Sequence, residues 1–323
     1  MKKILIVGGA GYIGSHTLKH FIENKYECVV LDNLVCGHAE AVMGAPLEKA
    51  DLLDKSSLQK VFDKHDIEAV VHFAAYSLVG ESVVNPQKYY QNNVSGTINL
   101  LDVMLEHGVK KIVFSSTCAT YGNPQYMPMD EKHPQSPINP YGQTKLIIEN
   151  IFKDYAKAYG LKYIALRYFN AAGAARDGSI GESHNPESHL IPLVLKAIKG
   201  ERENIKVFGN DYDTPDGTCL RDYIHVDDLA AAHRLAFEKI DDFCGAINLG
   251  TGIPTSVKEI IKAAEDVTGK ICPVVMEGRR AGDPARLYAD NKRAQEILGW
   301  KPIYTQIGDI IQTAWNWEIN RHF

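Results

Sequence analysis

The chain has 323 residues and a mass of 35.9 kDa, with 45% apolar and 23% charged residues, a composition typical of globular proteins. Its formal charge of -5 and its isoelectric point near 6.2 give no electrostatic case for binding nucleic acid or an anionic membrane. No segment approaches about 18 uninterrupted apolar residues, and Met1-Lys-Lys before a short apolar run predicts no signal peptide.

The cysteines and histidines suggest neither a disulfide framework nor a metal site. Six cysteines are scattered along the chain without a Cys-x-x-Cys pair, and the 12 histidines show no ligand spacing. We therefore expect a reduced, cytoplasmic protein without a structural metal.

The first elements predict a nucleotide-binding turn. Residues 2–7 read as a short buried strand, which runs into Gly8-Gly-Ala-Gly11-Tyr-Ile-Gly14 and then into a helix ending near Asn24. Glycines at this spacing allow a tight turn and a close approach of the backbone to a pyrophosphate. The helix N-terminus adds free N–H groups and a partial positive charge.

The second strand, residues 28–31, ends in Asp32, 18 residues after Gly14. A carboxylate at this place accepts hydrogen bonds from the adenosine ribose and repels a 2′-phosphate. Residues 33–37 bring no arginine or lysine, so the pattern predicts NAD rather than NADP. The alternative is an aspartate that only caps the loop after the strand.

Strands and helices then alternate, which predicts an α/β fold with a doubly wound parallel sheet of Rossmann type. Further strands are expected at 47–51, 69–74, 111–115 and 162–167, with helices near 55–65, 86–107 and 140–158. After residue 170 longer loops surround a helix near 188–200. We expect an NAD-binding domain over 1–170, to which 223–250 returns, and a smaller C-terminal α+β domain over 171–323 that binds substrate.

Tyr141-Gly-Gln-Thr-Lys145 opens the helix near 140–158 and carries the chemistry. The four-residue spacing puts both side chains on one helical face. A free phenol has a pKa of about 10, and lowering it by about three units requires about 4 kcal/mol. One cation at about 5 Å supplies about 3 kcal/mol at an effective dielectric of about 20. A second cation, such as an oxidised nicotinamide, would supply the rest.

These motifs together resemble the UDP-glucose (UDP-galactose) 4-epimerases of the extended short-chain dehydrogenase/reductase family, over nearly the whole chain. The glycine turn and the Tyr141–Lys145 pair mark only the superfamily. Narrower blocks carry the closer resemblance: Val79–Ser82, Asn92-Asn93, Phe114–Thr117, Arg167–Asn170, Phe208–Tyr212, Arg221–His225 and Arg280–Asp283.

The resemblance implies a nucleotide-sugar 4-epimerase that uses bound NAD and passes through a 4-keto sugar. The catalytic residues would be Thr117, Tyr141 and Lys145. The cofactor would be bound by Gly8, Gly11, Tyr12, Ile13, Gly14, Asp32, Asn33, Asp51, Leu52, Phe73, Ala74, Asn92, Tyr141, Lys145 and Tyr168. The UDP-sugar would be bound by Thr117, Tyr141, Asn170, His189, Leu190, Phe208, Arg221, Tyr223, Arg280, Asp283 and Leu287.

Several of these residues have structural alternatives. Arg221 and Asp222 could form a structural ion pair, Arg279-Arg280 could be a solvated turn, and Phe73 and Tyr168 suit packing better than chemistry. Two positions depart from the family: Thr117 replaces a serine and keeps its hydroxyl, and Ser77 replaces a lysine and loses one charged contact.

Two other functions remain open on this fold. A sugar-nucleotide 4,6-dehydratase needs an acid/base pair directly after Thr117, where this chain has Cys118-Ala119. A non-catalytic NAD sensor commonly loses the tyrosine or lysine that this chain keeps. The resemblance further implies a homodimer through helices 86–107 and 140–158. Leu287, where a tyrosine would reject an acetamido group, predicts that UDP-N-acetylglucosamine is also a substrate.

Overall fold

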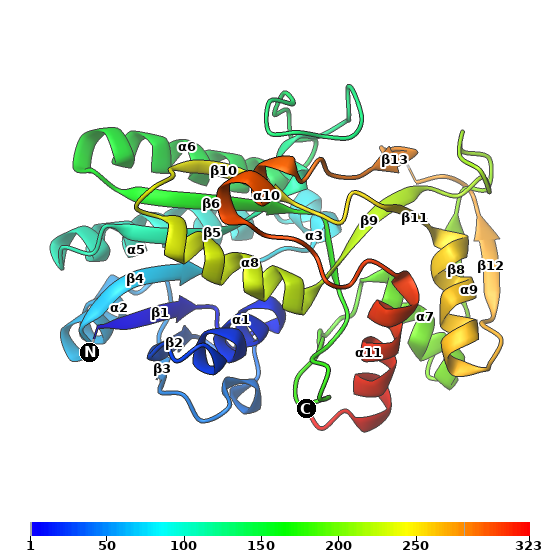
Figure 1. Cartoon of the computed structure of the whole chain (residues 1–323), viewed down its shortest axis with the longest axis horizontal. Helices are drawn as coiled ribbons and strands as arrows, with labels where there is room; N and C mark the ends of the chain where they lie inside the picture. The colour runs from blue at the N-terminus through cyan, green and yellow to red at the C-terminus, as the bar shows by residue number, and fades with distance from the viewer. Residues whose placement is uncertain (1, 281) are drawn as a thin grey trace.

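The computed structural model describes residues 2–280 and 282–323; Met1 and Ala281, the latter in the Arg280–Asp283 block, lie outside the described residues. Within that range the larger sheet has seven parallel strands in the order β10-β6-β5-β4-β1-β2-β3 (Figure 1). Their bounds are β1 Lys3–Val7, β2 Cys28–Asp32, β3 Leu47–Lys49, β4 Ile67–His72, β5 Lys111–Thr117, β6 Lys162–Tyr168 and β10 Gly245–Leu249. The order reverses between β1 and β4, the point at which doubly wound sheets bind ligands.

Helices cover both faces of this sheet because its strands are apolar on both sides. In β1, Ile4 and Ile6 pack against helices α1 and α8, whereas Leu5 and Val7 pack against α2 and α5. The helices of this layer are α1 Tyr12–Glu23, α2 Lys55–Lys64, α3 Val79–Val84, α4 Pro86–Tyr89, α5 Gly96–Glu106, α6 Pro140–Tyr159, α8 Val226–Lys239 and α10 Lys292–Leu298. The large sheet is also flanked by three shorter helical segments: the turns η1 Ala39–Val42 and η3 Cys118–Thr120, and the π-helical η2 Tyr90–Ser95.

Local sequence fixes where the helices begin. The side chain of Asp54 accepts hydrogen bonds from the first turn of α2, and Asn139 does the same for α6, whose first residue is Pro140. Ser256 and Glu259 form a capping box at the start of α9. Each of these caps satisfies helix N–H groups that have no partner within the helix.

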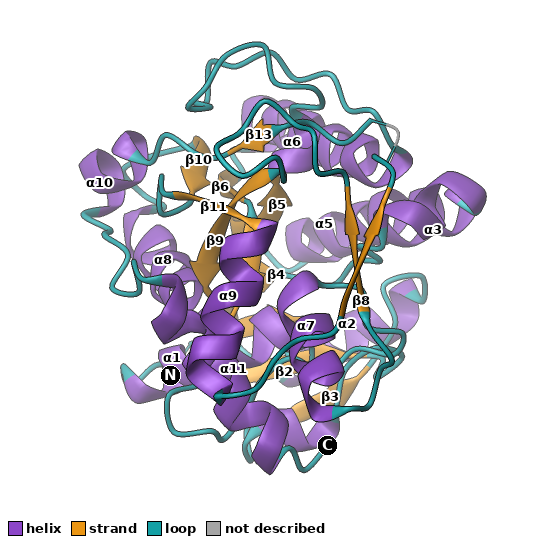
Figure 2. Cartoon of the chain, turned by 90° about the vertical axis from the view of Figure 1, so that its right-hand side faces the viewer, coloured by secondary structure: helices purple, strands orange, loops and turns teal. Residues whose placement is uncertain are grey.

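A second group of elements packs beside the carboxyl ends of the large sheet (Figures 1 and 2). It consists of β7 Asn170–Ala172, β8 Ile205–Phe208, β9 Leu220–His225, β11 Pro254–Ser256, β12 Val274–Glu277, β13 Arg286–Leu287, α7 Leu190–Lys199, α9 Val257–Thr268 and α11 Ile307–Asn320. Strands β7, β11 and β13 pair with β9, and β12 pairs with β8. Apolar faces of α7, α9 and α11 enclose a core of their own.

The parallel doubly wound sheet expected from the alternating pattern is confirmed, and most element bounds agree within two or three residues. The strand expected at 69–74 runs instead from Ile67 to His72, so Phe73 and Ala74 follow its end. Strand β10 lies beside β6, and α8 packs on α1, so the chain after β9 returns to the large sheet. Among the described residues, no helix is long and apolar enough to cross a membrane.

Candidate active site

The turn between β1 and α1 is so tight that two of its glycines have no room for a side chain. A Cβ on Gly14 would lie 2.1 Å from the carbonyl oxygen of Gly8, and a Cβ on Gly8, where φ is +80°, would lie 2.5 Å from the nitrogen of Ala74. Gly11 meets only ordinary contact, at 3.5 Å. It precedes Tyr12 at the start of α1, and no side chain caps this helix. The first N–H groups of α1 are therefore free to receive an anion.

Asp32 ends β2 and already accepts two backbone hydrogen bonds. Its Oδ2 accepts from Ala10 N at 3.0 Å and its Oδ1 from Leu34 N at 2.8 Å, and burial raises the pKa of its carboxyl group. The loop-capping role considered from the sequence is thus present. Each oxygen keeps a second lone pair, so a ribose role is compatible with these bonds.

The neighbouring cofactor candidates are joined by short polar contacts. The side chain of Asn33 donates to Asp51 Oδ2 at 2.9 Å, and Asp51 Oδ1 accepts from Leu53 N at 2.8 Å, which positions Leu52 between them. This arrangement brings the end of β2 and the residues after β3 together on one edge of the sheet.

The segment after β4 is pinned by Asn93, to which no role was assigned from the sequence. The amide of Asn93 bonds Tyr76 N and Tyr76 O, both at 3.0 Å, and donates to Thr144 Oγ1 at 3.2 Å. Asn92 in turn donates to Asn93 Oδ1 at 2.9 Å. A fully buried amide that joins three elements has a structural role, and its burial could not be read from the local sequence.

Phe73 and Tyr168 both pack against the same buried imidazole. Ring centroids of Phe73 and His233 lie 4.7 Å apart, and those of Tyr168 and His233 lie 6.2 Å apart. The Tyr168 hydroxyl also bonds Ser115 Oγ. These contacts agree with the packing role that the sequence favoured for both residues.

Thr117, Tyr141 and Lys145 lie together at the carboxyl end of β5. Thr117 is the last residue of β5, and Tyr141, the second residue of α6, lies close enough for the Thr117 side chain to lower the pKa of its phenol. Lys145, one turn later, donates from Nζ to Ser115 O at 2.7 Å and lies over the Phe114 ring at 4.6 Å. The four-residue spacing therefore directs both side chains of α6 toward the same strand.

The pKa of Tyr141 moves in the opposite direction to the one expected from the motif. Burial raises it above its usual value, as does the nearby Tyr168, while the Thr117 side chain acts the other way. Burial also lowers the pKa of Lys145 to about 7, against the opposing effect of Glu149. The physical reason is that desolvation disfavours both the phenolate and the ammonium ion. A further positive charge beside Tyr141 is needed to activate it.

A buried ion pair behind Lys145 was missed by sequence reasoning. Glu149 Oε1 accepts from Ser116 Oγ at 2.6 Å and from Arg167 Nε at 2.9 Å, and the second oxygen pairs with the same guanidinium. Arg167 Nη1 also donates to the Tyr121 hydroxyl at 3.0 Å. This network clamps α6 to strands β5 and β6 directly behind the Tyr141–Lys145 face.

Several substrate candidates lie around β9. Asn170 on β7 is in register with Tyr223 on β9, and its side chain donates to Asp222 O at 2.9 Å. The guanidinium of Arg221 pairs with Asp283 at 2.8 Å. The structural Arg221–Asp222 ion pair considered from the sequence is therefore wrong: the Asp222 carboxylate instead accepts backbone N–H groups from residues 251, 252 and 289.

The remaining substrate candidates divide into two groups. Arg280 lies over the Phe208 ring at 3.8 Å, and Leu287 is in register with Arg221 and packs against an apolar cluster that includes Cys118. His189 and Leu190 lie at the start of α7. His189 contacts Glu182 and Glu187. Among the interactions of the described residues, none joins His189 to Arg221 or Asp283.

Comparison with known proteins shows that residues 4–250 match the NAD dependent epimerase/dehydratase family. A protein of Halalkalibacterium halodurans named UDP-glucose 4-epimerase is 54% identical over 97% of this chain and 95% of its own length. The crystal structure of UDP-glucose 4-epimerase from Brucella ovis in complex with NAD is 51% identical, covers 98% of each chain and has a TM-score of 0.95. The UDP-Glc/GlcNAc 4-epimerase of Campylobacter jejuni is 42% identical, with a TM-score of 0.88 over 99% of this chain and 100% of its own.

Proposed function

Because the chain belongs to the NAD dependent epimerase/dehydratase family, we propose that it is a UDP-glucose 4-epimerase, which interconverts UDP-glucose and UDP-galactose with bound NAD. The observation that carries this function is the association of Thr117, Tyr141 and Lys145 at the end of β5. It supports proton transfer at one sugar hydroxyl, and the glycine turn after β1 supports a dinucleotide beside it.

Tyr141 takes the proton of the sugar 4-hydroxyl and later returns a proton to the 4-keto oxygen. NAD, when bound, supplies the acceptor for the hydride of carbon 4 and gives it back to the opposite face of the sugar. Thr117 accepts or donates a hydrogen bond at the same oxygen. Lys145 contributes positive charge beside the phenol, but its pKa of about 7 leaves it only partly protonated near neutral pH. The positive nicotinamide therefore adds the charge that the phenolate needs.

The cofactor is held by the turn and by the two carboxylates that follow β2 and β3. Free N–H groups at the start of α1 bind the pyrophosphate, and the narrow space around Gly8 and Gly14 lets it approach the backbone. Asp32 binds the adenosine ribose through its remaining lone pairs and excludes a 2′-phosphate.

The UDP moiety is bound by arginines that are positioned in advance. Arg221 is held by Asp283 and by two backbone carbonyls, and Arg280 by the face of Phe208. A guanidinium held in this way loses little freedom when it pairs with phosphate oxygens. Asn170 and Tyr223, side by side on β7 and β9, lie close enough to Arg221 along the strand to contact the same ligand.

Neither alternative function is favoured by the contacts. A 4,6-dehydratase needs a proton donor and acceptor after Thr117, but burial raises the pKa of the Cys118 thiol to about 12, and Ala119 has no titratable group. A non-catalytic NAD sensor has no use for Thr117, Tyr141 and Lys145 together at the end of β5.

Substrate breadth rests on Leu287, which packs against the same apolar cluster as Cys118 and is in register with Arg221. Leucine leaves space that a tyrosine would fill, so UDP-N-acetylglucosamine is also epimerised. The relative in Campylobacter jejuni, which is named for both sugars, supports this extension.

Quaternary state and location complete the proposal. The chain forms a homodimer through α4–α5 and α6, and the exposed apolar side chains of Val79, Val83 and Val84 beside these helices support it. All six cysteines are free, two of them exposed, which supports a reducing, cytoplasmic environment. Light scattering of the purified protein tests whether it forms a homodimer.

The test of function is an assay of the purified protein with UDP-glucose and with UDP-N-acetylglucosamine, without added NAD. Tyr141→Phe is expected to lower turnover by about two to four orders of magnitude while substrate affinity remains. Tyr159→Phe, at the exposed end of the same helix, is the matched control and should keep full activity. Retention of more than about a tenth of the wild-type rate in Tyr141→Phe would assign the base to another residue.

A further inference from the structure

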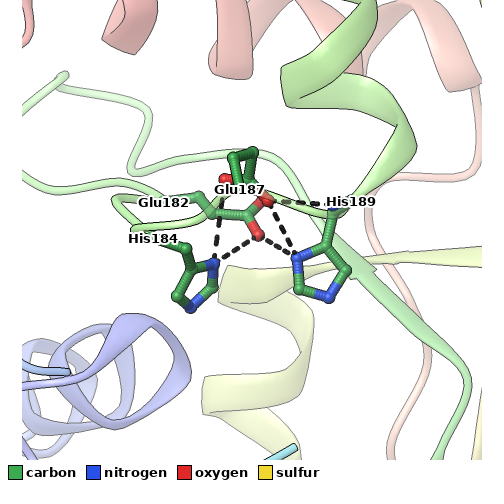
Figure 3. Close-up of side chains that lie close together, drawn as sticks. All are labelled: Glu182, His184, Glu187 and His189. Atoms are coloured by element: carbon green, nitrogen blue, oxygen red, sulfur yellow. Dashed lines mark hydrogen bonds and ion pairs between the residues drawn. The ribbon is translucent and has the colours of Figure 1, made fainter. Parts of the chain in front are cut away.

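Four metal-binding side chains converge in the loop between β7 and α7. They are Glu182, His184, Glu187 and His189, and the ligand atoms of all four lie within 4.8 Å of one another (Figure 3). His184 Nδ1 lies 3.0 Å from Glu182 and 3.8 Å from Glu187. His189 Nδ1 lies 2.6 Å from Glu182 and 3.3 Å from Glu187. Both rings thus turn the same nitrogen toward the same two carboxylates.

We propose that these four side chains bind one divalent transition-metal ion of the zinc type. In a tetrahedral site with bonds of about 2.1 Å, the ligand atoms are separated by about 3.4 Å. The four nitrogen-to-oxygen distances, from 2.6 to 3.8 Å, lie on both sides of that value. Small side-chain rotations would admit an ion without any change in the backbone.

The types of ligand decide which ions suit the site. Two imidazole nitrogens and two carboxylates favour zinc, cobalt, nickel or iron, whereas magnesium and calcium prefer oxygen ligands alone. The side chains of Glu182 and Glu187 are only 6% and 4% exposed, so their charges are largely removed from water. Two buried carboxylates at one point are costly unless a cation lies between them.

No structural metal was expected from the sequence, because the histidines show no motif spacing. The pattern is Glu-x-His-x-x-Glu-x-His, with all four ligands in an eight-residue loop. No regular helix or strand brings such positions together. The loop does so because it folds back on itself before α7, an arrangement that appears only in the three-dimensional structure.

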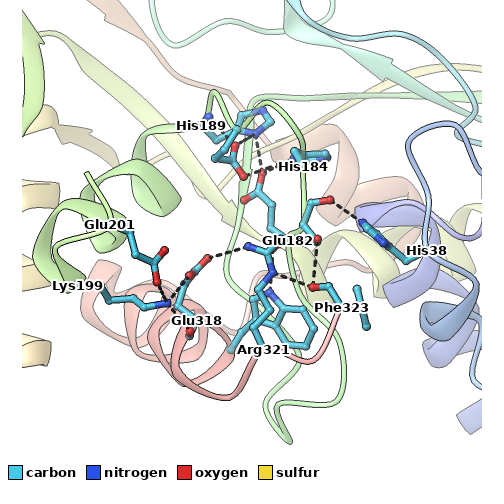
Figure 4. A network of polar contacts seen from close by, with 12 residues as sticks. His38, Glu182, His184, His189, Lys199, Glu201, Glu318, Arg321 and Phe323 are labelled. Carbon is cyan, nitrogen blue, oxygen red and sulfur yellow. Dashed lines mark hydrogen bonds and ion pairs between the residues drawn. The ribbon is translucent and has the colours of Figure 1, made fainter. Parts of the chain in front are cut away.

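The backbone of the loop is fixed by contacts from distant parts of the chain (Figure 4). Trp317 Nε1 on α11 donates to Glu182 O at 2.9 Å, and Arg321 Nη2 donates to Ser183 Oγ at 2.7 Å. His38, from the loop after β2, lies with Nε2 3.1 Å from Ser183 O. One edge of the site is therefore positioned in advance, which lowers the ordering cost of binding an ion.

An ion at this place would fix the start of α7. His189 is the N-terminal flanking residue of that helix and is half exposed, with Nδ1 turned inward. Coordination through Nδ1 leaves Nε2–H as a donor on the outer side of the ring. The ion would thus orient a side chain that the family resemblance assigns to the UDP-sugar, although the metal binding itself is independent of that assignment.

The experiment measures metal binding rather than activity. The purified full-length protein is treated with a chelator, dialysed and titrated with Zn²⁺ by calorimetry, and its content is checked by elemental analysis. Separately, Co²⁺ is added, and its absorption reports the geometry and type of its ligands. We expect one ion per chain and a cobalt spectrum typical of four-coordinate nitrogen and oxygen ligands, without thiolate-to-metal charge transfer.

Two variants and a control locate the ion. His184→Ala and His189→Ala are each expected to weaken Zn²⁺ binding by about 100-fold or more, since each removes a direct ligand. His189 is half exposed, so its variant retains the fold even if His184→Ala does not. The control His65→Ala removes a histidine whose Nε2 lies 2.7 Å from the single carboxylate Glu48, and the variant should bind Zn²⁺ as tightly as wild type.

Three results would overturn the proposal. One is a wild-type protein that binds no stoichiometric ion, which would leave the cluster as an ion-pair network between protonated histidines and glutamates. Another is unchanged binding in His189→Ala. The third is a cobalt spectrum with thiolate bands, which would assign the ion to the cysteines. Epimerase activity enters none of these readouts, so failure here and failure of the proposed function can be told apart.

Discussion

Neutralising Glu149 should destabilise the protein more than any loss of a surface charge. Its side chain is 1% exposed and that of its partner Arg167 is 4% exposed, so neither charge is solvated by water. The variant Glu149→Gln keeps the shape and one oxygen acceptor but leaves the guanidinium buried without a counter-charge. Breaking a buried pair in this way costs about 3–5 kcal/mol, and the retained oxygen places Glu149→Gln near the lower end, at about 3 kcal/mol.

Urea unfolding at pH 7 of holoenzyme and variant measures this loss as a shift of the midpoint. The matched control is Glu106→Gln, because Glu106 pairs with Lys55 at 2.8 Å but both side chains are well exposed. That exposed pair should contribute little to stability, because water and salt screen it. The double variant Glu149→Leu/Arg167→Met should recover most of the stability, since no charge then remains buried. A Glu149→Gln loss no larger than that of the control would show that the pair is not the clamp described above.

Three further predictions concern the turn, acid stability and sugar specificity. Gly14→Ala places a Cβ 2.1 Å from the oxygen of Gly8, so α1 must shift. The variant should lose about 1–3 kcal/mol of folding free energy and copurify with less NAD. The absorbance of the NAD released on denaturation measures the second effect. Burial lowers the pKa of His233 to about 4, so between pH 6.5 and 4 only the unfolded chain takes up a proton at this residue. The stability of the folded protein therefore decreases as the pH is lowered through this range. In urea unfolding, His233→Asn should reduce this decrease by about 1.4 kcal/mol per pH unit. Leu287→Tyr should suppress turnover of UDP-N-acetylglucosamine far more than that of UDP-glucose; an equal fall in both would remove Leu287 as the gate.

The fold could be predicted from the sequence because its signals are local. Short apolar strands, glycine turns and capped helices alternate through residues 2–170, and this rhythm alone indicates a parallel sheet. Strand ends were less certain: the apolar run 69–74 continues past the last paired residue of β4, His72, so Phe73 and Ala74 were assigned to the strand although they follow it. Apolar character persists there because Phe73 packs on His233, not because it is in the sheet.

Contacts between distant elements were harder to predict. The sequence left a pairing of Arg221 with its neighbour Asp222 open as the structural alternative, but adjacent residues on a strand point to opposite faces, so each finds a separate partner. Arg221 reaches Asp283, 62 positions away, and Asp222 turns inward to the backbone of residues 251, 252 and 289. The charges could be read from the sequence, but the face of β9 on which each lies could not be fixed without its register.

The pKa of Tyr141 shows the same limit in energetic terms. The spacing to Lys145 correctly predicted that the two side chains share a face, and Coulomb's law then gave an attraction. The opposing desolvation depends on how deeply α6 packs against β5, which spacing does not reveal. Burial is the largest effect on both groups, raising the pKa of the phenol and lowering that of the amine. A bound cation is therefore a stronger requirement than the motif alone suggested.

The ion pair behind the site did have a signal in the sequence. Tyr141, Lys145 and Glu149 are spaced by four, so the same helical face that carries the first two continues into a third charged residue. A carboxylate on a face that packs against a sheet must have a partner, and Arg167, inside the apolar strand β6, is a charge in equal need of one. Two unexplained charges on adjacent buried elements are better paired with each other than with water. Extending the catalytic spacing by one turn would have found Glu149. The charge of Glu149 raises the pKa of Lys145, and its pairing with Arg167 holds α6 in place.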